Sequence, residues 1–489
     1  MRKVKMGLLA AFLVVAGSVA AEGPARGAYI TVYGGPTYDA STQTGYESPR
    51  IHVAPGRGVN DAGTAVGYAW KYDAGVSKGY RAVRWDGSGT AATELGNLGT
   101  DASGRTDAEA YAVNDAGTAV GYSEKFDAGV HVGGRAVRWD ASGIATELGN
   151  LGTGSGGDPM PDAQAYAVNA AGTAVGYAKK YDAGVWKGER AVRWDASGTV
   201  ATELGNLGTN ASGVTYYAVA NAVNAAGTAV GYASKYDAGV WKGERAVRWD
   251  ASGTVATELG NLGTDAYSWA HAVNDAGTAV GWAWKYDAGD WKGERAVRWD
   301  ASGTAATELG NLGTDASGVA RGEAYTVNAA GTAVGYAWKY DAGLDKGSRA
   351  VRWDGSGTAA TELGNLGTDA SGYTWSEAFA INDVGTAVGD AYKYDALGTF
   401  LDVRAVYWGL DGAAVDLNTL IDLASGWTLT KASAISDTGW IAGIGLYDPD
   451  GAGGVDAYDR LFLMQVPEPA SAGLLVVGGL ALLRCRRRR

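Results

Sequence analysis

The ten residues VNDAGTAVGY occur at Val59–Tyr68 and again, unchanged, at Val113–Tyr122. Versions with one substitution begin at Val168, Val223, Val273 and Val327. The Asn of this motif stands at positions 60, 114, 169, 224, 274, 328 and 382, so successive copies lie about 54 residues apart. A repeat of this period limits the chain to a propeller, a solenoid or an array of similar units.

Two further motifs recur in step with the first. RAVRWD begins at Arg81, Arg135, Arg190, Arg245, Arg295 and Arg349, and ELGNLGT begins at Glu94, Glu147, Glu203, Glu258, Glu308 and Glu362. Altered versions bring each motif to eight copies: Ala434–Gly445 for the first, Arg404 and Arg460 for the second, and Tyr29 and Val415 for the third. Lys180–Thr209 and Lys235–Thr264 are identical, which indicates internal duplication.

The motifs read as strands. TAVGYAW and RAVRW both alternate between two kinds of residue with a period of two, and AYAVN and TELGNL supply two more short strands in each unit. No helical stripe runs through the repeats. Four strands in about 54 residues predict an all-β fold, a β-propeller of about eight four-stranded blades that spans residues 29–465. Seven blades are the alternative, because the first unit is weak and the eighth is altered.

The repeated Asn-Asp-Ala-Gly segment is expected to be a hairpin corner. Its Asn can bond to its own backbone, and its Gly, such as Gly117, can take a positive φ. A phosphate-binding loop is excluded, because no Gly-Lys-Ser/Thr and no helix follow.

Composition narrows the function classes. The 77 Gly, 27 Tyr and 18 Trp suit a β-rich protein. The net charge is −12 even though three cations open the chain and five arginines close it, so the repeats are strongly acidic and nucleic acid is excluded as a partner. The one cysteine, Cys485, lies in the basic tail, so the repeats have neither a disulfide nor a thiolate metal site.

Both ends have the pattern of sorting signals. Residues 1–21 have a cationic start, an apolar stretch and small residues near Ala20, as in a secretory signal peptide, and residues 22–28 form a short linker. At the other end stand Pro467, Glu468 and Pro469, an apolar run at 470–483 and an arginine-rich tail. Residues 466–489 resemble the PEP-CTERM sorting signal of Gram-negative bacteria. The resemblance implies a short membrane helix with a cytoplasmic Arg tail, and later processing by an exosortase-type enzyme.

The repeats also resemble the HAF family of extracellular repeats. One pass of the pattern comprises the LG-x-LG segment at Leu95–Gly99, the A-x-x-N-x-x-G-x-x-VG segment at Ala112–Gly121, and the apolar-Trp strand at Arg135–Trp139. The closing unit at 415–445 is similar as well. The family is associated with export and with PEP-CTERM tails, and it has no assigned chemistry.

Few residues have the pattern of a catalytic or metal site. His52, His131 and His271 stand at different phases of the repeat, and no nucleophile motif occurs. Carboxylates that recur once per unit would have equal environments, which argues against an acid–base pair. The Gly-rich stretch at 448–459 could hold Ca²⁺ through Asp448, Asp450, Asp456 and Asp459. No other cofactor is expected.

Aromatic residues are the candidate ligand-binding groups. Trp186, Trp241 and Trp291 are expected in loops, near Tyr181, Tyr236 and Tyr286. Such rings can stack on sugars, and several together would act with avidity; alternatively, they cap the grooves between blades.

The sequence therefore predicts an exported, non-catalytic cell-surface or matrix protein that binds exopolysaccharide. It would be held transiently in the inner membrane by its C-terminal helix. The alternative is a carbohydrate-active enzyme, a hydrolase or lyase, that acts from the asymmetric last blade.

Overall fold

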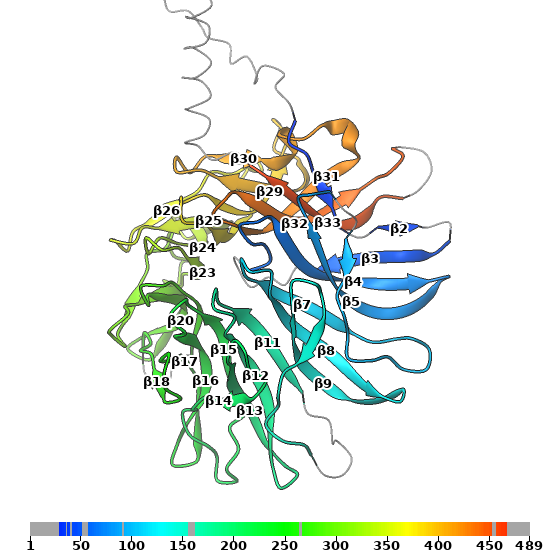
Figure 1. Cartoon of the computed structure of the whole chain (residues 1–489). Coiled ribbons are helices and arrows are strands. Elements are labelled where there is room, and N and C mark those ends of the chain that lie inside the picture. The colour runs from blue at the N-terminus through cyan, green and yellow to red at the C-terminus, as the bar shows by residue number, and fades with distance from the viewer. Residues whose placement is uncertain are drawn as a thin grey trace, which may run out of the picture.

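The repeats form eight β-sheets arranged in order around one axis (Figure 1). The computed structural model describes residues 29–466 apart from 36, 40–41, 51–56, 90–91, 155–161, 264–266 and 452–455. Seven sheets have four strands and one has five, so the predicted all-β propeller of eight blades is confirmed. The predicted signal peptide, the linker at 22–28, His52, the Pro467-Glu468-Pro469 motif and the segment at 470–483 lie outside the described residues.

Each blade uses the sequence motifs in order. The first strands are β3 (Thr44–Arg50), β7 (Ala108–Val113), β11 (Ala163–Val168), β15 (Ala218–Val223), β19 (Ser268–Val273), β23 (Gly322–Val327), β27 (Ser376–Ile381) and β31 (Trp427–Ile435). The second strands are β4 (Thr64–Asp73), β8 (Ala119–Asp127), β12 (Ala174–Asp182), β16 (Ala229–Asp237), β20 (Ala279–Asp287), β24 (Ala333–Asp341), β28 (Ala387–Tyr394) and β32 (Trp440–Tyr447).

The outer half of each blade is completed in the same way. The third strands are β5 (Val76–Asp86), β9 (Val130–Trp139), β13 (Val185–Trp194), β17 (Val240–Trp249), β21 (Asp290–Trp299), β25 (Leu344–Trp353), β29 (Phe400–Trp408) and β33 (Tyr458–Gln465). The fourth strands are β6 (Thr93–Glu94), β10 (Ala145–Glu147), β14 (Ala201–Glu203), β18 (Ala256–Glu258), β22 (Ala306–Glu308), β26 (Ala360–Glu362), β30 (Ala414–Asp416) and β1 (Tyr33–Gly34). Blade 1 has an additional edge strand, β2 (Tyr38–Asp39).

The two ends of the described chain close the ring in blade 8. Strand β1 pairs with β33, with Tyr33 opposite Leu463 and Gly34 opposite Phe462. The blue strand and the red strand of this blade lie together in Figure 1. This pairing confirms the predicted closure and excludes an open solenoid, because the N-terminal segment supplies the fourth strand that the last repeat lacks.

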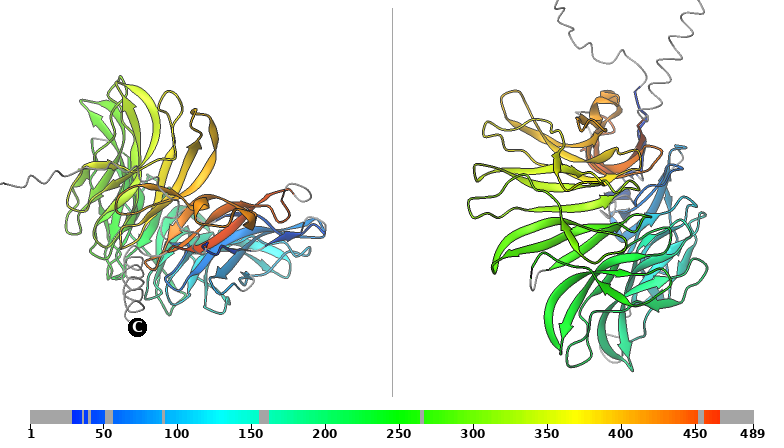
Figure 2. Two further views of the ribbon diagram at one scale, coloured as in Figure 1. Left: turned by 90° about the horizontal axis from the view of Figure 1, so that it is seen from above. Right: turned by 90° about the vertical axis from the view of Figure 1, so that its left-hand side faces the viewer.

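The propeller has two faces, which differ in the turns that they carry. The corner face carries the Asn-Asp-Ala-Gly turns between first and second strands, and the hairpin face carries the Asp-Ala-Gly turns between second and third strands. Figure 2 shows the blades from two further directions. The described chain has two short 3₁₀ helices, η1 (Leu417–Thr419) and η2 (Leu423–Ser425). Within the described ranges, no helix has the length and hydrophobicity that crossing a membrane requires.

The asparagine of each corner joins its own turn to the next blade. In blade 4, Asn224 Oδ1 accepts the backbone N–H of Thr228 at 2.9 Å, and Asn224 Nδ2 donates to the carbonyl of Asn274 in blade 5 at 3.1 Å. The same bond to the next corner recurs from Asn60, Asn114, Asn169, Asn274, Asn328 and Asn382. Blade 8 has Ser436 in the place of Asn, and there Thr438 Oγ1 donates to the carbonyl of Asp61 at 2.7 Å. The side chains thus form a continuous ring of hydrogen bonds around the axis.

The RAVRWD motif also crosses blade boundaries. Trp249 is fully buried, and its indole N–H donates to the carbonyl of Gly205 in the ELG segment of the preceding blade at 2.8 Å. Arg248 reaches the other way and donates to the carbonyls of Asp300 and Ala301 in the next blade, each at 2.8 Å. Equivalent tryptophans make the same bond at Trp139, Trp194, Trp299, Trp353 and Trp408, and equivalent arginines bond to the next blade at Arg84, Arg138, Arg193, Arg298 and Arg352. The motif therefore recurs because most blade boundaries use it.

The core lies between blades and consists mostly of small residues. Between blades 4 and 5 it contains Ala222, Val230, Ala246, Leu259, Ala270, Ala279, Ala283, Val297 and Trp299. Gly231 is small for a different reason, since a Cβ there would lie 1.9 Å from the carbonyl oxygen of Val219 in the first strand of the same blade. The expected positive φ of Gly117 is confirmed at 78°.

Replacing one corner asparagine tests the importance of this ring. We expect Asn224→Ala to lower the free energy of unfolding by about 2–4 kcal/mol, because it leaves the N–H of Thr228 without its partner and removes one of the two donors to the carbonyl of Asn274, which keeps the N–H of Gly277. Asn206→Ala is the matched control, because Asn206 accepts only the local N–H of Gly208; it should cost about 1 kcal/mol or less. Denaturant unfolding measures both, and equal losses would contradict a special role for the ring.

Candidate functional site

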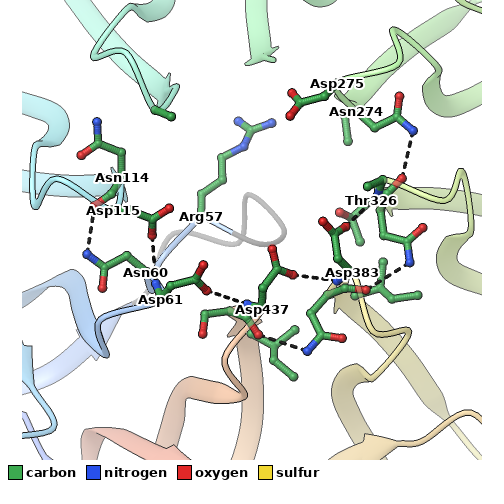
Figure 3. Close-up of a pocket in the computed structure, with 18 of the residues that line it drawn as sticks. Arg57, Asn60, Asp61, Asn114, Asp115, Asn274, Asp275, Thr326, Asp383 and Asp437 are labelled. Carbon is green, nitrogen blue, oxygen red and sulfur yellow. Dashed lines mark hydrogen bonds between the residues drawn. The ribbon is translucent and has the colours of Figure 1, made fainter. Parts of the chain in front are cut away.

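A cavity of about 350 Å³ lies on the axis at the corner face. All eight corners contribute to its lining, and Figure 3 shows many of the residues involved. The apolar part consists of the last residues of the first strands, including Val113, Val168, Val223, Val273, Val327, Ile381 and Ile435. The polar part consists of the corner asparagines and the residues that follow them.

Five aspartates follow the corner Asn or Ser around the cavity: Asp61, Asp115, Asp275, Asp383 and Asp437. Each accepts the backbone N–H of the corresponding residue in the preceding blade, as in Asp437 N–H to Asp61 Oδ1 at 2.8 Å. Burial, together with the neighbouring carboxylates, raises the pKa of Asp437. Alanine takes this place in the other three blades. The carboxylates therefore reinforce the ring.

Arg57 enters the cavity from blade 1 and bonds to its far wall. Its guanidinium donates to the backbone carbonyls of Asn221 in blade 4 and His271 in blade 5, the second at 3.3 Å. Burial lowers the pKa of Arg57 to about 10, which leaves it cationic at neutral pH. The cavity thus holds one cation among five carboxylates, and these groups already have partners within the chain.

The first strands carry the residues that differ most between repeats. At one equivalent position stand Glu109, Gln164, Val219, Trp269, Glu323 and Glu377. Blades 6 to 8 bring titratable groups together here. Glu377 lies opposite Asp390 on β28, and Tyr325 OH donates to Glu377 Oε2 at 3.2 Å. Lys431 of blade 8 lies 4.1 Å from the ring centroid of Phe379.

We call Glu377, Asp390, Tyr325 and Lys431 the Glu377 cluster. Burial raises the pKa values of its two carboxyl groups. Burial, and secondarily the charge of Asp390, raises the pKa of Glu377 to about 7. Burial raises the pKa of Asp390 to about 6 against the opposing effect of Lys431. Two neighbouring carboxyls with different and raised pKa values are suited to proton transfer near neutral pH. Neither carboxyl is among the residues singled out from the sequence, and the signal that could have found them is Asp390, which stands where other blades have a tyrosine or tryptophan.

A series of six aromatic rings runs over blades 4 and 5 toward the hairpin face. In order they are Trp241, Tyr267, Trp284, Trp282, Trp269 and Tyr232, with successive ring centroids 5.8, 4.3, 6.4, 5.4 and 4.3 Å apart. We call it the aromatic series. Trp241 at its outer end is 48% exposed, whereas Trp282 is buried beneath its neighbours. Several members occupy positions where the repeats differ.

The tryptophans singled out from the sequence lie in strands, so their predicted placement in loops is wrong. Trp186, Trp241 and Trp291 are the second residues of β13, β17 and β21, next to the hairpin turns, and they are 38%, 48% and 37% exposed. Each pairs across the hairpin with a tyrosine, respectively Tyr181, Tyr236 and Tyr286. Tyr181 and Tyr236 are buried, so they support the tryptophans rather than offer open faces.

These tryptophans also contact the next blade. The ring centroids of Trp186 in blade 3 and Tyr216, just before β15 of blade 4, are 6.1 Å apart. The guanidinium carbon of Arg321 lies 5.9 Å from the ring centroid of Trp291. They therefore cover blade boundaries, as the alternative interpretation held, while part of each ring stays open to solvent.

The described residues do not bring Asp448, Asp450, Asp456 and Asp459 together as a group of Ca²⁺ ligands. Asp448 Oδ1 accepts the backbone N–H groups of Asp450 and Gly451 at 3.3 and 2.9 Å, which forms a local turn. Within the described residues, which include Asp456 and Asp459 but not 452–455, no three acidic, His or Cys side chains are grouped as metal ligands.

The glutamates of ELGNLGT have a structural role. Glu203 contacts Lys180 at 2.7 Å and Arg190 at 3.1 Å within blade 3. The same Lys–Glu–Arg group recurs at Glu94, Glu147, Glu258, Glu308 and Glu362. The two described histidines are dispersed: His131 lies near Glu124 and His271 near Glu323, each at 3.6 Å.

Comparisons with known proteins return distant structural similarities. No family model and no curated protein matches the chain. Among solved structures, the β-propeller domain of the Trilobed protease from Pyrococcus furiosus is 10% identical, with a TM-score of 0.40, over 76% of this chain and 94% of that one. The GH74 xyloglucanase from Xanthomonas campestris is 13% identical, with a TM-score of 0.37, over 88% and 67%. Polysaccharide lyase Uly1 is 8% identical, with a TM-score of 0.36, over 90% and 98%. At this level of similarity, none of them carries a conclusion about function.

The raised pKa of Glu377 predicts a pH-dependent stability. The folded protein holds a proton on Glu377 up to about pH 7, whereas the unfolded chain loses it near pH 4.5, so this group destabilises the fold progressively as pH rises through that window. Glu377→Gln keeps an acceptor for Tyr325 and cannot ionise. We expect it to gain stability relative to the parent, by on the order of 2 kcal/mol at about pH 8 and little at about pH 5.

Glu362→Gln is the control, because Glu362 is paired with Lys339 and Arg349 and should lose stability at both pH values. Denaturant unfolding at the two pH values measures these differences. A pH-independent effect of Glu377→Gln would contradict the assignment.

Proposed function

We propose that this protein is an exported, non-catalytic cell-surface propeller that binds extracellular polysaccharide. The observation that carries this proposal is the aromatic series with the partly exposed tryptophans beside the hairpin turns. Its terminal segment, which resembles a PEP-CTERM signal, would pass it to an exosortase-type processing enzyme.

The burial of the tryptophans separates two classes. The repeated Trp of RAVRWD, such as Trp249, is 0% exposed and serves the blade boundary. Trp186, Trp241 and Trp291 remain 37–48% exposed on rigid strands. Aromatic faces fixed on a rigid frame stack on sugar rings with little loss of conformational entropy. Several such rings on one propeller can bind one polymer at several points at once.

The chain ends support an orientation for this surface. Strand β33 ends at Gln465, and the N–H of Val466 donates to the carbonyl of Gly439 in the blade 8 corner at 3.0 Å. The described chain therefore stops at the corner face, directly before Pro467. A membrane segment that follows it would hold the corner face toward the membrane and direct the hairpin face outward, toward the matrix.

Removing the exposed rings tests the proposal. Trp241→Ala should weaken retention by an immobilised polysaccharide about 2- to 10-fold, since one stacking contact contributes roughly 0.5–1.5 kcal/mol. The triple variant Trp186→Ala, Trp241→Ala, Trp291→Ala should abolish it. Affinity electrophoresis through gels with embedded polymers measures the retention.

Leu410→Ala is the matched control, because Leu410 is 63% exposed on the corner face and should leave retention unchanged. The melting temperature of the triple variant should stay within a few degrees of the parent. A folded triple variant with full retention would show that these rings are not the binding surface, and early unfolding would assign them to the core.

A second candidate function, a glycan-cleaving enzyme, is favoured by the Glu377 cluster. Asp390 and Glu377 are cross-strand neighbours with different raised pKa values, as an acid–base pair requires. If they act in this way, the release of reducing ends from a bound polymer should fall at least about 100-fold in Asp390→Asn. Asp250 is exposed on the corner face, so Asp250→Asn should leave the release of reducing ends unchanged. Polymer binding with no cleavage by the parent protein would exclude this candidate.

A further inference from the structure

Three glutamates stand at one equivalent position beside the aromatic residues of blades 3 to 5. Glu189, Glu244 and Glu294 lie on β13, β17 and β21, three residues after Trp186, Trp241 and Trp291. All three are half-buried. Blades 2, 6 and 7 have other residues in this place, so the glutamates accompany the exposed tryptophans rather than the fold.

Two of these carboxylates bond to members of the aromatic series. Trp269 Nε1 donates to Glu244 Oε2 at 2.8 Å, and Trp284 Nε1 donates to Glu294 Oε1 at 3.4 Å. The bonds fix the carboxylates and indoles relative to each other. Each bond engages one carboxylate oxygen and leaves the negative charge uncompensated, because an indole N–H is neutral.

The nearby cations have ion-pair partners other than these glutamates: Lys179, opposite Glu189 on β12, contacts Asp162 at 3.5 Å. Glu258, on the fourth strand of blade 4, contacts Lys235 at 2.6 Å and Arg245 at 3.6 Å. In contrast, no Lys or Arg nitrogen of the described chain lies within 4 Å of Glu189, Glu244 or Glu294. Arg321 lies over the Trp291 and Trp338 rings at 5.9 and 5.1 Å, close enough for its charge to favour the ionised form of Glu294.

Burial raises the pKa of Glu244 and of Glu294, and Glu323 adds to the effect at Glu294. At Glu294 the charge of Arg321 opposes this effect without cancelling it, and at Glu244 only the bond from Trp269 opposes it. A ligand that brings its own positive charge would supply a cationic partner.

Resting on the proposed glycan binding, we propose that the ligand is a polysaccharide with protonated primary amines, an amino-sugar polymer without N-acetyl groups. Carboxylates attract an ammonium group, and indole faces attract a cation through their ring electrons. The sugar rings stack on the same tryptophans. A polymer of uronic acids would be repelled by the same glutamates.

The experiment compares a glucosamine hexasaccharide, its fully N-acetylated form and a uronate oligosaccharide by calorimetric titration at near-neutral pH and low salt. We expect the amine form to bind at least about tenfold more tightly than the acetylated form, and the uronate to bind least. The double variant Glu244→Gln, Glu294→Gln should abolish this preference, because glutamine still accepts the indole N–H bonds but carries no charge. The double variant Asp250→Asn, Asp300→Asn, which changes the net charge equally on the corner face, should retain it.

The outcomes separate the two proposals. Equal binding of the amine and acetylated forms, or a preference that survives in the glutamine variant, would overturn the amine inference and leave glycan binding intact. Binding of no saccharide by the folded parent would overturn both. Since Glu→Gln preserves shape and hydrogen bonding, the melting temperature should confirm that the variant is folded.

Discussion

The ring of blades depends on the two hydrogen bonds that the side-chain amide of each corner asparagine makes. One side chain accepts an N–H within its own turn and donates to the carbonyl of the next corner, as Asn224 does between Thr228 and Asn274. A shorter or charged side chain cannot do both, since both a donor and an acceptor are needed at fixed separation. The angle between neighbouring blades is therefore set by one contact that occurs seven times, with Thr438 supplying the eighth bond.

The contacts that are common to most blade boundaries explain which positions can vary between repeats. Trp249, Arg248 and the small core residues occupy the blade boundaries, and the Trp and Arg are the same residues in blades 1 to 6. The positions at 269, 244 and 377 take no part in these common contacts, and the bonds they make across a boundary, such as Trp269 to Glu244 and Tyr325 to Glu377, differ from blade to blade. Carboxylates and rings gather at these places, which is why departures from the repeat, rather than the repeat itself, mark the proposed binding surface.

The site could be anticipated only in part. The tryptophans at 186, 241 and 291 are singled out from the sequence as aromatic residues expected in loops, and the structure places them in strands beside the hairpin turns. The aromatic series was not foreseen, because it joins Trp241 to Tyr232 through residues of two blades. The order of residues along the chain does not specify which side chains meet across a blade boundary. The aspartates at 448 and 450 show the converse, since neighbours in sequence formed a turn instead of a shared site.

The sequence by itself determined the unit: four strands, their order, the corner at each Asn-Asp-Ala-Gly, and eight copies. Period-two alternation and turn residues are local properties, so a single chain segment contains them in full. Only the tertiary structure decided that Tyr33 and Gly34 complete blade 8, that Arg57 bonds to the far wall, and that Glu244 meets Trp269. These contacts follow from closing the ring, because closure brings together residues whose separation along the chain leaves no local pattern.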